Sequence, residues 1–364
     1  MSSGDMALGH LNSLRILTGL GRWARIGGFG VLALVAQGAP PAPPTVDFKP
    51  PPWPDPPVPA TASGAAATEG ETASETAPAA LPAANWLEAQ VELARRGFSS
   101  GSIDGVLGPQ TRAALVAYQG SVGLEPTGAL DEPTRAQLAL TRAAWEEVEL
   151  TEDDFAGLLP VSTTWLGKSQ QEAMAHETVL ERIAERAHAH PGLVKKLNPG
   201  FDWTQAAPGA RVRLPAVAPV QVSSPLAHLH IRLADRVLQG RDADGRLVVH
   251  FPVSIARDVA KRPVGELRIT VVVPNPDYTF NPDVFPESEE ARQLGRKLMI
   301  PPGPNNPVGL AWIGLDRPGY GIHGTPLPEQ VGRTESHGCF RLANWDATTL
   351  LPLVRVGLPV LIEP

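Results

Sequence analysis

The feature that most limits the fold of this chain is a low-complexity stretch near its N-terminus. Residues 39–84 consist mainly of Pro, Ala, Thr, Ser and Glu. Such a stretch has too few large apolar groups to offset the entropy cost of ordering it, so we interpret it as a semi-extended spacer. The folded part must therefore lie downstream. A chain of 364 residues is too long for one core, and two or three domains are expected.

A short apolar run precedes the spacer. Arg15, Arg22 and Arg25 stand before the apolar residues 26–36, and small residues follow that run. This order is typical of a secretory signal peptide, which we assign to residues 1–38. The run is shorter than the roughly 20 apolar residues of a transmembrane helix. We therefore expect export to the periplasm, with an uncleaved membrane anchor and a buried N-terminal helix as the alternatives.

The charge and the cysteine content narrow the choice of function. The formal net charge is -7 and Lys and Arg form no cluster, which argues against nucleic acid as a partner. Cys339 is the only cysteine, so no disulfide can form within the chain. In an oxidising compartment such a thiol must pair with another chain, lie buried or do chemistry.

Residues 85–141 are predicted to form a domain of three short helices. Apolar residues recur with helical spacing from Trp86 to a stop at Gly97. Residues 104–115 and 127–138 then form a weak repeat, in which a glycine turn leads into a proline-marked helix start.

The same region resembles the peptidoglycan-binding type 1 domain. Residues 101–119 fill the family pattern G-x-x-D-G-x-x-G-P-x-T-x-x-A-L-x-x-Y-Q. The resemblance implies peptidoglycan as the ligand. A helical module with another partner is the alternative, because a fold does not fix its ligand.

Residues 142–218 are interpreted as a linker and a second small module. Residues 176–187 have the apolar spacing of one helix face, and residues 193–197 support a second helix that ends at Asn198. A turn and a short strand follow at 208–215. This order resembles a degenerate LysM domain, a glycan-binding βααβ module, and a structural connector is the alternative.

Residues 222–364 are predicted to form a mainly β domain. Alternating apolar residues at 228–233 and 246–255, with a turn at Asp244 and Gly245 between them, predict hairpins.

Two histidines lie on the first of these predicted strands. His228 and His230 point to one face and could in principle ligate a metal. No third ligand lies nearby in the sequence. We therefore expect a pair of solvent-side histidines on an edge strand, and no metal site.

A long proline-rich insertion interrupts the β domain. It runs from Pro274 to Pro307 and carries Tyr278 and Phe280. Long ordered loops in compact domains are usually functional. We expect a lid over a substrate groove, with an inert insertion as the alternative.

Residues 320–344 carry the groups that acyl transfer needs, namely a nucleophile, a base and donors for an oxyanion. Cys339 is the candidate nucleophile, and His323 and His337 are the candidate bases. Arg341 is a fork-shaped donor suited to a carboxylate. Three glycines permit tight turns and leave main-chain N–H groups free, and these are Gly321, Gly324 and Gly338.

Taken alone, these residue types leave other interpretations open. A zinc site could use two histidines and one cysteine, although no Cys-x-x-Cys or His-Glu-x-x-His accompanies them. A free cysteine can also be a buried structural residue.

The arrangement strongly resembles the signature of the L,D-transpeptidase catalytic domain, also called the YkuD domain. His323-Gly324 is followed by SHGCFRLAN at 336–344, which fills the family pattern S/T-H-G-C-h-R-h-x-N. The resemblance covers residues 226–362, and only the turn at 261–267 departs mildly from it. It implies a mainly β catalytic domain with a mixed sheet or sandwich, and hence a multidomain α+β protein.

The resemblance also implies catalytic roles. Cys339 would be the nucleophile and His323 the general base, with the carbonyl of Gly324 orienting the imidazole. The oxyanion pocket would be shaped by His337, Gly338 and the Cys339 amide.

Four further residues are expected to serve the substrate. Arg341 and Asn344 would brace the site or contact substrate, and Ser336 and Tyr278 complete the expected substrate-binding set. The resemblance implies neither a metal nor a cofactor.

The implied reaction has two halves. The Cys339 thiolate attacks the carbonyl of the third residue of a peptidoglycan stem tetrapeptide and expels the terminal D-alanine. An amine of a neighbouring stem then resolves the thioester, which gives a 3→3 cross-link. Water or a lysine of an envelope protein are alternative acceptors, and a non-catalytic scaffold that binds glycan strands in the cell wall is the competing class.

Overall fold

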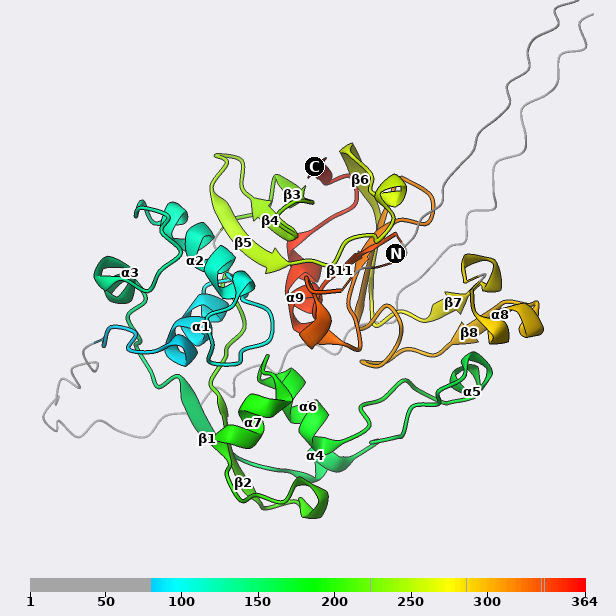
Figure 1. The fold of residues 1–364 in the computed structure, drawn as a ribbon, viewed down its shortest axis with the longest axis horizontal. Helices are drawn as coiled ribbons and strands as arrows, with labels where there is room; N and C mark the ends of the chain where they lie inside the picture. The colour runs from blue at the N-terminus through cyan, green and yellow to red at the C-terminus, as the bar shows by residue number, and fades with distance from the viewer. Residues whose placement is uncertain (1–79, 223, 286, 335, 337) are drawn as a thin grey trace, which may run out of the picture. The chain divides into compact units, whose positions relative to one another are not determined.

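The computed structural model describes residues 80–364 except 223, 286, 335 and 337 (Figure 1). The predicted signal peptide at 1–38 and residues 39–79 of the predicted spacer lie outside the described residues. The described residues belong to one compact unit. Within the described part of the chain, no helix is long and apolar enough to cross a membrane.

The first domain contains the three predicted helices. They are α1 (Trp86–Arg95), α2 (Pro109–Ser121) and α3 (Glu132–Gln137). The Asn85 side chain caps α1 by accepting from Glu88 N, and α2 has proline in its first turn as predicted.

The weak sequence repeat has a structural basis in two buried glutamines. The Gln90 carbonyl oxygen accepts from Gly105 N at 2.7 Å, and the Gln119 carbonyl oxygen accepts from Gly128 N at 2.8 Å. Both glycines have positive φ, +74° and +66°, which a residue with a Cβ rarely adopts. Each glutamine therefore holds one glycine turn against the helix that carries it.

The second module has a two-stranded sheet and two central helices. Strand β1 (Trp145–Glu149) pairs antiparallel with β2 (Arg211–Pro215), and α6 (Val179–Arg186) and α7 (Pro191–Leu197) lie between them in the chain. The structure confirms the two predicted helices and the last strand. It adds the short helices α4 (Glu152–Phe155) and α5 (Trp165–Ser169), which the sequence did not indicate.

The C-terminal domain is built on one sheet of eight strands in the order β11-β10-β9-β6-β12-β3-β4-β5. These strands are β3 (His228–Arg232), β4 (Val237–Arg241), β5 (Leu247–Pro252), β6 (Gly265–Pro274), β9 (Ala311–Leu315), β10 (Gly321–His323), β11 (Phe340–Arg341) and β12 (Pro359–Glu363). Most neighbours are antiparallel, whereas β12 and β3, and β10 and β11, are parallel. The sheet is therefore mixed, as expected.

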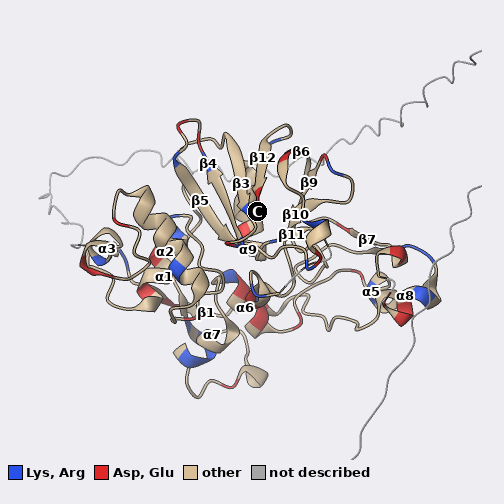
Figure 2. Ribbon diagram, turned by 45° about the horizontal axis from the view of Figure 1, so that its top comes forward, with Lys and Arg blue, Asp and Glu red and all other residues tan. Residues whose placement is uncertain are grey.

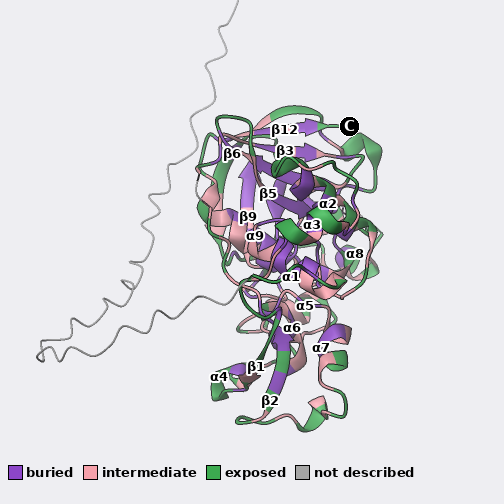
Figure 3. Cartoon of the chain, turned by 90° about the vertical axis from the view of Figure 1, so that its left-hand side faces the viewer, coloured by how far each residue is buried: buried purple, intermediate pink, exposed green. Residues whose placement is uncertain are grey.

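The sheet curls until its two ends meet. Beyond β5, Ser254 N donates to the carbonyl of Arg341 in β11 at 2.9 Å, and Arg341 N donates back to the carbonyl of Ser254 at 3.0 Å. The buried strands enclose the main core, and α9 (Asn344–Leu350) packs on it through Ala347 and Leu350 (Figure 3). The domain is thus a mainly β, curled sheet.

The prediction that His228 and His230 lie on an edge strand is wrong. Strand β3 lies between β12 and β4, and His230 Nε2 is 2.9 Å from a carboxylate oxygen of Glu363. The order of the strands explains the error, because β12 comes from the far end of the chain and covers the edge that β3 would otherwise present.

The real edge of the sheet, β5, is covered by the first domain. Ser99 N donates to the carbonyl of His250, and His250 N donates to the carbonyl of Gly97, both at 2.8 Å. Covering an edge in this way satisfies backbone groups that would otherwise be open to another chain.

The proline-rich insertion folds as a small ordered subdomain. It contains the hairpin of β7 (Tyr278–Phe280) and β8 (Leu298–Ile300), with α8 (Glu289–Leu294) between the two strands. We refer to residues 274–307 as the lid segment. Short 3-10 helices complete the described part, at Trp203–Gln205, Val259–Lys261, Pro282–Val284, Pro328–Gln330 and Leu351–Leu353.

Candidate active site

Strand β10 ends with the predicted base His323, and the predicted nucleophile Cys339 directly precedes the neighbouring strand β11. His323 is the register partner of Arg341, and Ile322 is the partner of Phe340. Partners in a parallel pair share a face and successive side chains alternate. His323 and Arg341 therefore share the face opposite Ile322 and Phe340, which are buried in the core, and Cys339 directly precedes β11.

The His323 imidazole is held as a neutral base. Its Nδ1 lies 2.6 Å from the carbonyl oxygen of Gly324 and donates to it in the Nδ1-protonated tautomer, which leaves Nε2 free to accept a proton. The ring stacks on Trp312 with centroids 5.7 Å apart. Burial, opposed by the Gly324 hydrogen bond and assisted by the charge of Arg341, lowers the pKa of His323 to about 4. The ring is therefore uncharged near neutral pH.

The Cys339 thiol is hydrogen-bonded to the backbone and not to the proposed base. Its Sγ donates to the carbonyl oxygen of Gly319 at 3.5 Å. Burial raises the pKa of the thiol, while a Gly321 backbone hydrogen bond and the charge of Arg341 oppose the rise. Among the described residues, no hydrogen bond joins Sγ to His323, so proton transfer requires the thiol to turn from Gly319.

Arg341 places a positive charge beside the thiol. Burial lowers its pKa, whereas Cys339 and Tyr278 act in the opposite direction. Its buried Nε has no hydrogen-bond partner among the described residues. A buried donor without a partner costs free energy, so a carboxylate or carbonyl of a substrate that accepts from Nε would bind favourably here.

Tyr278 of the lid segment lies within electrostatic reach of the same two side chains. Burial raises the pKa of Tyr278 to about 12, with a further rise from Cys339 and an opposing effect of Arg341. The phenol thus stays protonated and can serve as a neutral donor or acceptor.

Ser336 closes the turn that leads to the nucleophile. The side chain is buried, and its Oγ donates to the carbonyl of Cys339 at 2.5 Å and accepts from Gly338 N at 3.2 Å. The hydroxyl thus serves the loop itself. His337 lies outside the described residues.

Asn344 is fully buried behind the site. Its Oδ1 accepts from Leu310 N and Thr325 N, both at 3.1 Å. Its Nδ2 donates to Glu185 Oε1 and to the carbonyl of Pro304, also at 3.1 Å. Of the two roles expected for Asn344, bracing the site or contacting substrate, this geometry favours bracing.

Three contributors escaped sequence reasoning. Trp312 pairs with His323 across β9 and β10, Gly319 accepts from the thiol, and Glu185 reaches Asn344 from the second module. Only Trp312 carried a local signal, since an aromatic residue in the strand before the His-Gly pair suits stacking on the imidazole.

The described residues offer no metal centre. Within residues 80–364, apart from the four gaps, no group of three His, Cys, Asp or Glu side chains could hold a metal ion.

Figure 2 shows charged residues of both signs spread over the helices.

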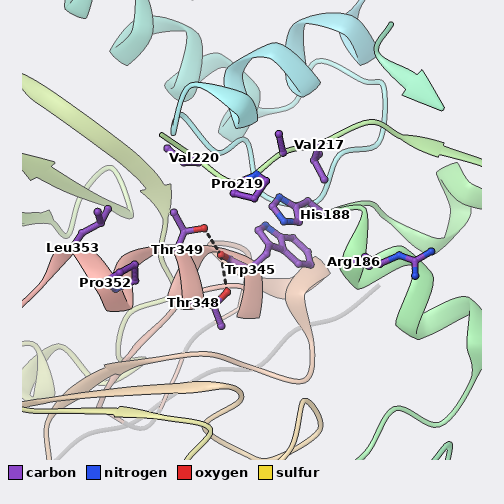
Figure 4. A pocket seen from close by; sticks show the side chains of 11 residues that line it. Arg186, His188, Val217, Pro219, Val220, Trp345, Thr348, Thr349, Pro352 and Leu353 are labelled. Atoms are coloured by element: carbon purple, nitrogen blue, oxygen red, sulfur yellow. Dashed lines mark hydrogen bonds between the residues drawn. The ribbon is translucent and has the colours of Figure 1, made fainter. Parts of the chain in front are cut away.

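A cavity of about 440 Å³ lies away from the cysteine (Figure 4). It is lined by residues of the second module, of α9 and of the segment that joins them, including His188 and Trp345, whose rings stack with centroids 5.4 Å apart. Neither Cys339 nor His323 lines it.

Two family models match the chain. Residues 227–362 match the model described as "L,D-transpeptidase catalytic domain". Residues 82–138 match the model described as "Putative peptidoglycan binding domain".

Several curated proteins are similar. A Bacillus licheniformis protein named "Putative L,D-transpeptidase YkuD" is 26% identical over 51% of this chain and 93% of its own length. Two Bacillus subtilis proteins with names of the same kind, YqjB and YkuD, are 39% and 41% identical over 33% of this chain. The matched parts make up 61% and 56% of those two proteins, less than two thirds of either.

Solved structures of L,D-transpeptidases are also similar. The Xylanimonas cellulosilytica enzyme is 16% identical, with a TM-score of 0.33 over 78% of this chain and 95% of that chain. The Enterococcus faecium C442S mutant is 16% identical, with a TM-score of 0.29 over 38% of this chain and 50% of that chain.

Proposed function

We propose that this chain is a transpeptidase that cross-links peptidoglycan stem peptides through an acyl-enzyme on Cys339, a proposal supported by the match of residues 227–362 to the L,D-transpeptidase catalytic domain and by relatives named L,D-transpeptidase. The observation that carries the proposal is the shared face of β10 and β11. Arg341 and the neutral His323 lie together on it, Cys339 directly precedes β11 and feels the charge of Arg341, and the Gly324 carbonyl fixes the imidazole tautomer.

Acylation is the first half of the proposed reaction. His323 Nε2 takes the thiol proton, and the thiolate attacks the carbonyl carbon of the third stem residue. The Cys339 amide is the proposed donor to the oxyanion, because Gly338 N already donates to Ser336 Oγ in this structure. The intermediate collapses by breaking the peptide bond, and the His323 imidazolium returns the proton to the departing D-alanine amine.

Transfer is the second half. An amine from a neighbouring stem attacks the thioester carbonyl, His323 accepts a proton from that amine, and the Cys339 thiolate leaves and takes this proton from the imidazolium. The products are a 3→3 cross-link and free enzyme. A water or protein-lysine acceptor would use the same acyl-enzyme and would give a carboxypeptidase or a protein-attaching enzyme.

Arg341 and Tyr278 are the proposed substrate contacts. Arg341 has an unused buried Nε, which suits a stem carboxylate. Tyr278 stays protonated near neutral pH and can donate to a peptide carbonyl.

The two upstream modules are proposed to hold the enzyme on the wall. The match at residues 82–138 supports peptidoglycan binding by the first. The LysM-like assignment of the second is supported by an antiparallel pair, β1 and β2, with α6 and α7 between them in the chain. Several weak contacts with one insoluble polymer reinforce each other. We place the enzyme in the periplasm, on the layout of residues 1–38.

The product pattern tests the proposed function. The purified protein is incubated with a disaccharide tetrapeptide, and the products are separated and weighed by mass spectrometry. We expect a cross-linked dimer together with released D-alanine, and no product from Cys339→Ala. Tripeptide without dimer would assign hydrolysis instead, and dimer formation by Cys339→Ala would refute the proposal.

A further inference from the structure

The second module does not stay apart from the catalytic domain. Between α4 and α6 it sends out residues 156–176, which we call the arm, and the arm carries α5. Figure 1 shows α5 beside β8 and α8 of the lid segment. The arm and the lid segment share a small apolar core, separate from the main core of the sheet.

Trp165 of the arm is the centre of this contact. Its ring stacks on Phe280 with centroids 4.3 Å apart and an interplanar angle of 18°. It also lies 5.5 Å from the ring of Phe285 and 6.3 Å from the ring of Tyr278. Offset and tilted aromatic contacts at these distances are attractive beyond the area they bury.

The backbone of the arm also contacts the lid segment, through hydrogen bonds. Met174 N donates to the carbonyl of Pro302 at 2.9 Å, and Asn305 N donates to the carbonyl of Met174 at 2.8 Å. Between them, Gly303 has a φ of +140°, and a Cβ there would lie 2.3 Å from the Met174 oxygen. A separate bond joins Leu166 N to Glu290 Oε1 of α8 at 3.1 Å.

The hairpin face that Trp165 covers also carries Tyr278. Tyr278 pairs with Ile300 and Phe280 pairs with Leu298, so these four side chains share one face. The other face carries Thr279 and Met299, which are exposed.

We propose that Trp165 is a positioning residue. Through Trp165 the arm holds the lid hairpin in place, so that Tyr278 lies beside Cys339 and Arg341 and forms one side of the binding site for the donor stem peptide. The observation is that one ring, from a module outside the catalytic sheet, packs on both Phe280 and Tyr278. The inference rests on the proposed function for its substrate, but the position of the lid can be tested without it.

Alkylation of Cys339 provides that test, because this is the only thiol in the chain. The protein is treated with iodoacetamide or with a bulky maleimide, and both rates are followed by intact mass. Loss of the aromatic contacts in Trp165→Ala should raise the ratio of maleimide to iodoacetamide rates about tenfold. Using the ratio cancels any change in thiol pKa that the variant causes.

A kinetic readout separates positioning from simple stability. Trp165→Ala should raise the KM for the donor stem by a similar factor while kcat changes little, and Trp165→Phe should restore both the KM and the alkylation ratio. Trp145→Ala is the matched control, because that tryptophan lies in β1 of the same module, stacks on Arg213 and contacts no lid residue among those described.

Gly303→Ala gives a second route to the same displacement, and decides the matter if Trp165→Ala fails to fold. It should raise the alkylation ratio. Gly295→Ala in the same lid segment should not, because it also puts an alanine at a positive φ (+55°) but no atom lies within 4 Å of the added Cβ, so it controls for backbone strain alone. An unchanged ratio in the folded variants would overturn the inference and leave the proposed function standing. If the alkylation ratios change as expected but the wild-type protein does not turn over a stem peptide, the proposed function is wrong and the inference about the lid position stands.

Discussion

Asn344 ties the position of the proposed base to three separate segments. A Cβ on Gly324 would lie 2.3 Å from its Oδ1, and one on Gly309 would lie 2.0 Å from it. The Asn344 carboxamide thus occupies space that is open only because residues 309 and 324 are glycines. The Gly324 carbonyl next to it accepts the hydrogen bond from His323 Nδ1. Both polar atoms of the Asn344 side chain are hydrogen-bonded within the protein, and the tautomer of His323 depends on the loop that Asn344 braces.

Replacing Asn344 by Ala should therefore damage both stability and catalysis. Two backbone N–H groups would lose their acceptor and the Glu185 carboxylate would lose a donor, at a cost of about 3 kcal/mol in the free energy of unfolding. We expect kcat to fall with little change in KM, measured by donor-stem kinetics beside urea unfolding. Wild-type kcat in a destabilised Asn344→Ala protein would show that the loop does not position the base.

At the scale of elements, sequence reasoning succeeded where the signal is local. Helix α1 has its apolar spacing and α2 its proline-marked start within their own residues, and the turn before β5 contains Gly245, whose φ is +78°. The two helices, the turn and β5 were predicted.

It failed where an element depends on a distant partner. Strand β1 reads WEEVE and is largely exposed, and it exists because it pairs with β2 far along the chain. The arm has no apolar period, since its core is completed by the lid segment. The site followed the same rule: the residues on β10 and β11 were found from one motif, whereas Glu185 was not, because only tertiary structure brings it to Asn344.

In the whole molecule, a buried polar contact joins the first domain to the catalytic domain. Ser99 Oγ of the first domain donates to Asp346 Oδ2 of α9 at 3.0 Å. Burial, opposed in part by this bond, raises the pKa of Asp346 to about 8. Asp346 lines one small cavity with His188 of the second module, distinct from the cavity of Figure 4. Burial lowers the pKa of His188 to about 4, so His188 brings no compensating charge.

Stability should therefore depend on pH through Asp346. Its folded pKa lies above the unfolded value of about 3.9, so the stabilisation is fully present below that value and is lost as pH rises towards 8, by about 1.4 kcal/mol per pH unit. Urea unfolding from pH 5 to 8 should show a smaller loss with rising pH in Asp346→Asn than in wild type. The exposed Asp153→Asn control should follow wild type, and parallel curves for all three proteins would contradict the burial of a neutral carboxyl.

The central claim is that Cys339 carries the stem peptide between the two halves of the reaction. Its most direct test is the intact mass of the full chain, quenched in acid within the first turnover on a tetrapeptide stem without an acceptor amine. We expect added mass equal to the tripeptide acyl group, lacking D-alanine, mapped to Cys339 and absent from Cys339→Ala. Turnover without an adduct, or an adduct on any other residue, would contradict it.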